Sequence, residues 1–318
     1  MKIVLLRFSS AGDIILVAEV IKKLKQIKNA QIYLVVKEIN AAPAGLTGAT
    51  QVLALDVKKG LNSAVKAINS LSPDIIIDLQ GNFRSKYITF FAKAKEKYYY
   101  AKDIFKRRFM VMFKWFLAED MRIAERYIKT AQPLLKKYAI ETEIPPVKKV
   151  TKGEGVLIHG GAKWPLKRWP HTHTLAKLLA EKKISTTLTG LKAEIENTTV
   201  YDKNEYIKDL TGKTDFNTLA KLVQTSAVVV CNDSVVAHLA RLYEVPCVVF
   251  MGPTCEAFGF VTAKDFHILQ KELLCRPCDL HGGKTCPIGT FECMKDITAT
   301  EAVNMITEVL HKPGKNIK

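Results

Sequence analysis

The first residue with clear chemical potential is Asp13, in the loop RFSSAGD. The loop follows a short apolar run and leads into residues with helical spacing, so Gly12 allows a tight turn and Asp13 lies near a helix N-terminus. An aspartate there caps the helix, or it acts as a general base that takes a proton from an attacking hydroxyl. Taken alone, the loop favours the cap. It is not a dinucleotide-binding fingerprint, because GxGxxG is absent.

A second group of residues could bind an anion, and it lies in the second half of the chain. Lys167 stands in KRWP, shortly after Gly160 and Gly161 of the segment HGGA. Asp233 and Ser234 follow the apolar run AVVVC, where a strand ends and a helix begins, which is an anion-binding geometry. A single lysine is usually a solvated surface charge, but the adjoining RWP and the preceding glycines favour phosphate binding.

Four cysteines near the C-terminus have the spacing C-x2-C-x7-C-x6-C. Thiolates at such intervals suit a structural zinc or another soft metal. The spacing leaves open both a metal site and a group of thiols without metal, whereas disulfides are less expected in a cytoplasmic protein. The four residues are Cys275, Cys278, Cys286 and Cys293.

The elements that must position these residues follow from alternating apolar runs and helical segments. At 318 residues, the chain is long enough for two domains. Such alternation predicts a parallel, doubly wound sheet, with ligands outside the carboxyl ends of its strands. The apolar runs are KIVLLRF, IYLVV, QVLAL and DIIID, followed by GVLIHGG, STTLTG, SAVVVCND and VPCVVFMGPT. The stretch ETEIPPVKKVTKGEG marks a linker, so we predict Rossmann-like domains over residues 1–150 and 151–318.

Six motifs in a fixed order resemble one known family. They are RFSSAGDIILVAEVIKKLK, DLQGNFRS, KRWP, DLTGKTDFNTLAKLV, NDSVVAHLA and GPT. Over essentially the whole chain they resemble glycosyltransferase family 9, the lipopolysaccharide heptosyltransferases. The resemblance implies a GT-B fold, with two Rossmann-like domains facing each other across a cleft. It also implies a nucleotide-diphosphate sugar donor, most expected to be ADP-heptose, in the C-terminal domain and a lipopolysaccharide acceptor in the N-terminal domain. Inversion at the anomeric carbon, without a catalytic metal or other cofactor, is implied as well.

The resemblance assigns roles to individual residues. Asp13 matches the catalytic base, Lys167 the phosphate-binding lysine and Asp233 the acid that contacts the donor sugar. Glu194 matches the acid that binds the donor ribose, with Glu196 as an alternative register. The predicted donor-binding residues are Gly160, Gly161, Lys167, Glu194, Asp233, Ser234, Gly252 and Thr254, and the predicted acceptor-binding residues are Ser10, Gly12, Gln80, Arg84, Arg107 and Arg108.

The chain departs from the family pattern at two places in the second half. The family more often has PGA where this chain has HGGA, and usually has glycine at the position of Val235. We therefore expect the backbone to approach the donor differently there. His238, one helical turn after Ser234, is expected to have a structural role.

Positive charge is concentrated in the first half of the chain, and most densely in residues 84–114. The net charge is +17, of which residues 1–150 carry +14. Residues 84–114 hold 10 Lys and Arg against two acids, interleaved with aromatic residues that continue to Trp115 and Phe116. Basic and aromatic residues together suit nucleic acid or an anionic membrane surface, and a Lys-rich solubilising surface is the plain alternative. We favour an anionic glycolipid, with Arg84, Lys106, Arg107 and Arg108 as contacts.

Composition excludes other classes. The longest apolar runs are interrupted by charges, so no segment predicts a membrane span. The N-terminus does not resemble a signal peptide, and we expect a cytoplasmic monomer, peripheral at the inner face of the inner membrane. The alternatives are another nucleotide-sugar donor, a nucleotide-dependent oxidoreductase of the Rossmann type and a basic nucleic-acid-binding protein. The oxidoreductase alternative is disfavoured because this chain lacks the glycine fingerprint of such enzymes. The nucleic-acid-binding alternative is disfavoured because it would leave Lys167 and Asp233 unexplained.

Overall fold

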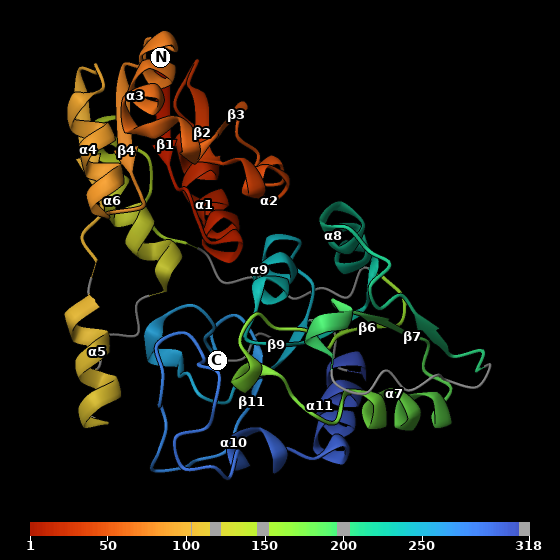
Figure 1. Cartoon of the computed structure of the whole chain (residues 1–318). Coiled ribbons are helices and arrows are strands. Elements are labelled where there is room, and N and C mark those ends of the chain that lie inside the picture. The colour runs from red at the N-terminus through yellow and green to blue at the C-terminus, as the bar shows by residue number, and fades with distance from the viewer. Residues whose placement is uncertain (103, 115–121, 145–152, 196–203, 312–318) are drawn as a thin grey trace. The chain divides into compact units, whose positions relative to one another are not determined.

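The chain divides into two compact units, which are described separately (Figure 1). The computed structural model describes residues 1–102, 104–114, 122–144, 153–195 and 204–311. One unit comprises Met1–Asp103 with Met121–Pro145, and the other comprises Ile104–Asp120 with Pro146–Lys318. The predicted domain boundary at residue 150 lies outside the described residues. None of the helices within these ranges is long and apolar enough to cross a membrane.

The first unit is built on a parallel sheet of five strands in the order β3-β2-β1-β4-β5. Its strands are β1 (Lys2–Leu6), β2 (Gln31–Lys37), β3 (Gln51–Leu55), β4 (Ile75–Asp78) and β5 (Glu96–Tyr99). Its helices are α1 (Ala11–Leu24), α2 (Ala41–Gly45), α3 (Gly60–Ser70), α4 (Phe83–Phe91) and α6 (Ile123–Lys137), with short 3-10 turns at Glu38–Asn40 and Val57–Lys59.

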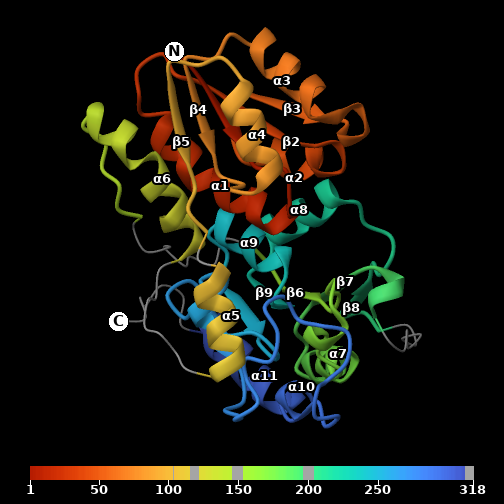
Figure 2. The same ribbon diagram turned by 60° about the vertical axis from the view of Figure 1, so that its left-hand side comes forward.

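Helices cover both faces of this sheet, so every side chain of β1 beyond its first residue is apolar and buried. Val4 and Leu6 pack with Ile68 of α3 and Ile88 of α4 on one face. Successive side chains of a strand point to opposite faces, so Ile3 and the other odd positions face the second layer. That layer contains α1 and α6, which contact each other extensively (Figure 2).

The second unit has a parallel sheet of six strands in the order β11-β10-β9-β6-β7-β8. Its strands are β6 (Val156–His159), β7 (Thr186–Thr189), β8 (Ile207–Asp209), β9 (Val228–Asn232), β10 (Cys247–Phe250) and β11 (His267–Leu269). Its helices are α5 (Ile104–Phe113), α7 (Thr172–Glu181), α8 (Phe216–Thr225), α9 (Val235–Leu242), α10 (Glu292–Lys295) and α11 (Ala299–His311). Short 3-10 turns lie at Pro165–Lys167, Lys192–Glu194 and Glu256–Phe258.

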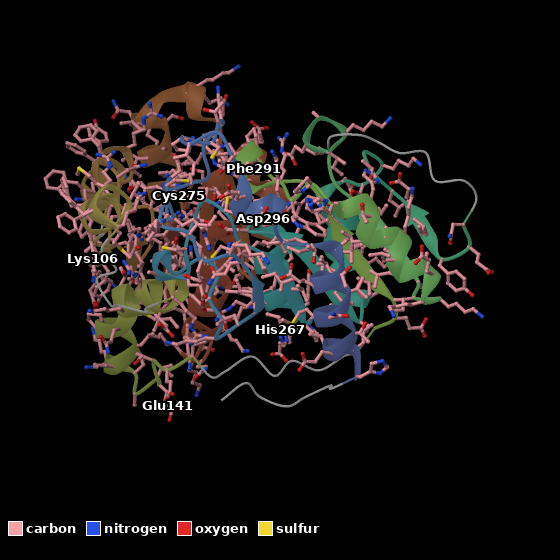
Figure 3. The ribbon with its side chains drawn as sticks, turned by 90° about the horizontal axis from the view of Figure 1, so that it is seen from below. Lys106, Glu141, His267, Cys275, Phe291 and Asp296 are labelled. Atoms are coloured by element: carbon pink, nitrogen blue, oxygen red, sulfur yellow. The ribbon has the colours of Figure 1, made fainter. Side chains whose placement is uncertain are left out.

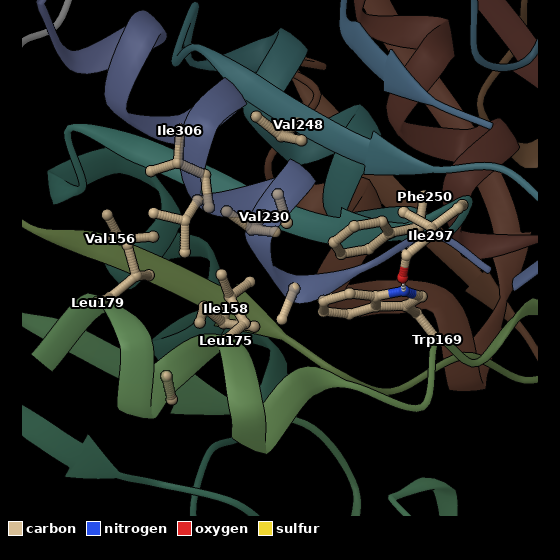
Figure 4. Packing of buried hydrophobic residues seen from close by; sticks show 14 of the residues in the cluster. Val156, Ile158, Trp169, Leu175, Leu179, Val230, Val248, Phe250, Ile297 and Ile306 are labelled. Carbon is tan, nitrogen blue, oxygen red and sulfur yellow. Dashed lines mark hydrogen bonds between the residues drawn. The ribbon is translucent and has the colours of Figure 1, made fainter. Parts of the chain in front are cut away.

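The core of the second unit includes Trp169, which comes from the predicted KRWP motif and lies at one end of the cluster (Figure 4). Its indole stacks on Phe250 at the end of β10, with ring centroids 3.9 Å apart. The indole nitrogen donates a hydrogen bond of 2.8 Å to the carbonyl oxygen of Ile297. A buried tryptophan with its N–H satisfied fixes the loop that carries Lys167 to the edge of the sheet. The predicted α/β fold with two doubly wound parallel sheets is confirmed.

Candidate active site

Asp13 lies at the third position of α1, directly after the loop that follows β1. Its Oδ2 atom accepts hydrogen bonds from the backbone nitrogen of Ser10 at 3.1 Å and from the Ser10 hydroxyl at 2.8 Å. Ser10 is the N-cap residue of α1, so the contact to its backbone nitrogen is half of a capping box. The capping role is therefore present, and predicted residues Ser10 and Gly12 lie in the same turn.

Two residues that the sequence did not single out hold the Asp13 carboxylate on its other sides. Arg7 Nη2 lies 2.7 Å from Oδ2, and the Tyr127 hydroxyl donates to Oδ1 at 3.3 Å. Arg7 is anchored by a hydrogen bond of 2.7 Å from Nη1 to the carbonyl oxygen of Leu79. The side chains of Arg7 and Asp13 are only 7% and 13% exposed. Asp13 is thus a half-buried, paired carboxylate with a fixed orientation.

These contacts set the protonation state of Asp13. Burial raises its pKa, but the positive charge of Arg7 and the hydrogen bonds from Ser10 outweigh burial, so the pKa of Asp13 is lowered. Burial raises the pKa of Tyr127 well above its usual value, so its hydroxyl keeps the proton that it donates. Asp13 is consequently ionised at neutral pH. Among the described residues, Tyr127 is the only hydrogen-bond donor to Oδ1, which leaves that oxygen able to accept a proton.

The loop after β4 carries the predicted acceptor residue Gln80 and is held by Asp78. Asp78 is fully buried, and its Oδ1 accepts hydrogen bonds of 2.9 Å from the backbone nitrogens of Gln80 and Gly81. Gln80 Oε1 in turn accepts a hydrogen bond of 3.3 Å from the backbone nitrogen of Ser9. The structure therefore joins the loops after β1 and β4, which are neighbouring strands. Arg84 is exposed in the first turn of α4.

The remaining predicted acceptor residues, Arg107 and Arg108, lie on α5 and so belong to the second unit. Asp13, Ser10, Gly12 and Gln80 belong to the first. Nothing in the structure of either unit alone brings the two groups together. Trp115, Phe116 and Glu196 lie outside the described residues.

In the second unit, three predicted donor-binding residues meet at one carboxylate. Lys167 Nζ lies 2.6 Å from Asp233 Oδ2, and the Thr254 hydroxyl donates to the same oxygen at 2.7 Å. They come from the turn Pro165–Lys167, the end of β9 and the loop after β10, which are brought together at the carboxyl edge of the sheet. Burial raises the pKa of Asp233, but Lys167 and Thr254 outweigh it and the pKa is lowered. The site holds a fixed ion pair with a lysine that has further N–H donors.

Asn232, the last residue of β9, connects this ion pair to the glycine loop after β6. Its amide nitrogen donates to the carbonyl oxygens of Gly160 at 2.8 Å and Gly161 at 3.3 Å. Its amide oxygen accepts a hydrogen bond of 3.0 Å from the backbone nitrogen of Trp169. The side chain is 1% exposed. Asn232 thus holds two loops at once. In the sequence, the only indication of this role was its position at a strand end, directly before Asp233.

Glu194 lies beside the glycine loop, as the sequence predicted for donor residues. A methyl group built on Gly161 would lie 2.7 Å from Glu194 Oε2, so this carboxylate packs directly against the glycine. His159, which ends β6, is half-buried, and desolvation lowers the pKa of its ring to about 4, so the ring is neutral at physiological pH. Ser234 is the N-cap residue of α9 and accepts a hydrogen bond of 3.4 Å from the backbone nitrogen of Val236.

Arg276, which is not one of the predicted site residues, holds the GPT loop. Its guanidinium donates to the carbonyl oxygen of Gly252 at 2.5 Å and to that of Thr254 at 3.1 Å. A methyl group on Gly252 would lie 2.7 Å from Met294 Sδ, so the glycine is needed for packing. The only sequence signal for Arg276 was its place between two cysteines in CRPC. His238 is buried in α9.

The four clustered cysteines all line one cavity, together with Leu166 and Pro253. All four thiols are free. Burial raises the pKa of Cys278, and it raises that of Cys293 to about 11. Across the described ranges, no three His, Cys, Asp or Glu side chains are arranged to hold a metal ion. The structure gathers the residues that the spacing selected, while the metal itself stays a prediction.

Comparison with known proteins places this geometry in a family. The model of glycosyltransferase family 9 (heptosyltransferase) matches residues 62–284. Lipooligosaccharide heptosyltransferase 2 of Campylobacter jejuni is 25% identical over 249 residues, covering 74% of this chain and 75% of that protein.

Two solved structures from E. coli have the same fold. The ADP-heptose lipopolysaccharide heptosyltransferase II matches with a TM-score of 0.70 and 16% identity, covering 98% of this chain and 99% of that one. The heptosyltransferase WaaC with ADP matches with a TM-score of 0.67 and 17% identity, covering 97% and 100%. The predicted GT-B fold is thereby confirmed. The chain belongs to glycosyltransferase family 9, the heptosyltransferase family, and is a glycosyltransferase.

Proposed function

We propose that this enzyme transfers a heptose from ADP-heptose to an inner-core sugar of lipopolysaccharide, with inversion at the anomeric carbon and without a catalytic metal. The observation that carries the proposal is the group of Lys167, Asp233 and Thr254 at the carboxyl edge of the second sheet. A related E. coli protein is described as an ADP-heptose lipopolysaccharide heptosyltransferase, and another was solved with ADP. These descriptions support the donor and acceptor proposed for this chain.

The donor would bind at the second sheet through its diphosphate. Lys167 keeps one N–H on Asp233 and offers the others to phosphate oxygens, while the N-terminus of α9 adds its partial positive charge. Asp233 can accept hydrogen bonds from sugar hydroxyls, and Glu194 can do so from the ribose. Fixed cations and helix N-termini can stabilise a departing diphosphate, so the proposed mechanism uses no metal.

Asp13 would act as the base. In a direct displacement, the acceptor hydroxyl loses its proton as its oxygen attacks the anomeric carbon, and the bond from that carbon to the diphosphate oxygen breaks. Asp13 Oδ1 takes the proton, and Arg7 and Ser10 hold the carboxylate through Oδ2. The lowered pKa of Asp13 keeps it in the required ionised form.

The acceptor in this proposal is an anionic glycolipid, and the enzyme works as a monomer at the cytoplasmic face of the inner membrane. The excess of positive charge in the first half of the chain supports an anionic partner. Nucleic acid is not proposed as a partner, because the family assignment accounts for the Lys167 and Asp233 loops that such a protein would leave unexplained.

The direct test measures transfer from ADP-heptose to a deacylated inner-core acceptor, with UDP-, GDP- and dTDP-sugars as competing donors. Asp13→Asn is compared with Asp215→Asn, which also removes a charge from an aspartate that caps a helix. We expect Asp13→Asn to lose transfer while it still binds ADP, and Asp215→Asn to keep it. Full activity in Asp13→Asn would refute the assigned base, and a strict preference for another nucleotide would refute the donor.

A further inference from the structure

One face of α5 holds this helix against the second unit. The Arg107 guanidinium lies 5.4 Å from the centre of the Phe260 ring, and the Met110 side chain is buried. Lys114, directly after the helix, donates a hydrogen bond to the carbonyl oxygen of Pro277. Arg107 and Met110 are three positions apart in α5, so they lie on a single face, and Lys114 attaches the chain directly after the helix. This face accounts for the attachment of α5 to its own unit.

The opposite face of α5 is apolar and exposed to solvent. Phe105 is 86% exposed and Met112 is 68% exposed. Phe109, which lies between them in sequence, and Phe113, which follows Met112, are also exposed. The rings of Phe109 and Phe113 contact each other, with centroids 4.4 Å apart. Positions 105, 109, 112 and 113 form one helical stripe. In an ordinary surface helix such a stripe faces the core, whereas here it faces away from it, which marks an interaction surface.

Positive charge borders this stripe. Within Ile104–Phe113 there are three basic residues and no acidic one. By helical spacing, Lys106 and Arg108 border the apolar stripe on its two sides. Lys106 is labelled in Figure 3. An apolar face that carries aromatic residues and is bordered by Lys and Arg is typical of helices that lie in the boundary between lipid headgroups and acyl chains.

Charge favours a bilayer over a second copy of this chain. The chain carries a net charge of +17, so two copies repel each other, whereas anionic headgroups attract the same residues. Nucleic acid offers phosphate for the basic residues but no apolar medium for Phe105 and Met112.

We propose that the outer face of α5, formed by Phe105, Phe109, Met112 and Phe113, docks the enzyme on a bilayer that contains anionic phospholipid. The inference rests on the proposed function only in that the glycolipid acceptor lies in the same leaflet. Docking places the aromatic side chains among the upper acyl carbons and the flanking cations at the headgroups. It needs neither donor nor acceptor, so it can be measured apart from transfer.

The test is flotation of the full chain with phosphatidylcholine vesicles, with and without phosphatidylglycerol. The variant is Phe105→Ser/Met112→Gln, which changes the two most exposed side chains of the stripe. The matched control is Ile39→Ser/Leu274→Gln, because Ile39 and Leu274 are 87% and 97% exposed elsewhere on the chain. We expect the α5 variant to lose about tenfold or more of its partition into anionic vesicles, and the control to partition like the unchanged chain.

Transfer to a deacylated acceptor separates this proposal from the proposed function. We expect the α5 variant to keep that rate and its ADP affinity, and to transfer more slowly only to acceptor embedded in vesicles. Absence of vesicle binding in the unchanged chain, or equal binding by variant and control, would overturn the docking surface. The docking surface would also be overturned if the α5 substitutions removed self-association or DNA binding of the chain and left its vesicle binding unchanged.

Discussion

Replacing Lys167 by methionine tests the donor site most sharply. The ammonium is 2.6 Å from Asp233 Oδ2, and the Lys167 side chain is only 14% exposed, so solvent screens the pair weakly. A hydrogen bond to a charged group contributes about 1.5–3 kcal/mol, which corresponds to roughly 10- to 150-fold in the Kd for ADP. The unpaired charge of Asp233 would also repel the diphosphate, so we expect a loss near the upper end.

Isothermal titration calorimetry with ADP measures this loss, and Lys163→Met serves as control. Lys163 is exposed on the same loop, with its ammonium 5.6 Å from the centre of the Trp164 ring. The control removes the same charge four residues away and is expected to cost no more than about 1 kcal/mol. The ligand-free Lys167→Met variant should also melt at a lower temperature, because Asp233 loses its cation. Equal ADP affinities of the two variants would refute a phosphate-binding role for Lys167.

Three further predictions follow from the same contacts. The pKa of Asp13 is lowered, so we expect kcat to stay on its plateau as the pH falls through the usual range of Asp and to decline only below it; a decline with a midpoint near neutral pH would contradict Asp13 as the base. Asn232→Ala should lower the free energy of unfolding by about 1–3 kcal/mol, measured by urea denaturation, because it leaves buried backbone groups unpaired; an unchanged midpoint would show that the two loops hold without it. If the cavity lined by Cys275, Cys278, Cys286 and Cys293 binds zinc, elemental analysis of the purified protein should find nearly one zinc per chain. A zinc content near zero would refute a zinc site in this cavity.

The central strands and the loops at their carboxyl edges could be predicted from sequence, because covered parallel strands are continuous apolar runs and a change to small and polar residues marks the strand end. The edge strands β5, β8 and β11 were not predicted, because they are short and less apolar. Lys167 and Asp233 were selected separately, and the structure adds that they form an ion pair.

The contacts that position these residues could not be predicted in the same way. Tyr127 is 114 residues from Asp13 in the chain, and no local pattern connects them. The sequence indicated only that Arg7 lies at the end of a strand, and it did not indicate that the Arg7 guanidinium pairs with Asp13. Arg276 was not among the predicted residues, because nothing in the local sequence indicates its hydrogen bonds to the GPT loop. Chain order also assigned α5 to the first half, whereas its contacts through Arg107 and Lys114 are with the second unit.

The proposed reaction moves a heptose from ADP-heptose to a lipopolysaccharide core sugar. Its most direct test is an incubation of the purified full chain with ADP-heptose and a deacylated inner-core acceptor, followed by mass spectrometry of the acceptor and quantification of ADP. We expect one heptose added per ADP released, with the reaction lost in Asp13→Asn. ADP release without a heptosylated acceptor, or transfer from a different nucleotide sugar alone, would contradict it.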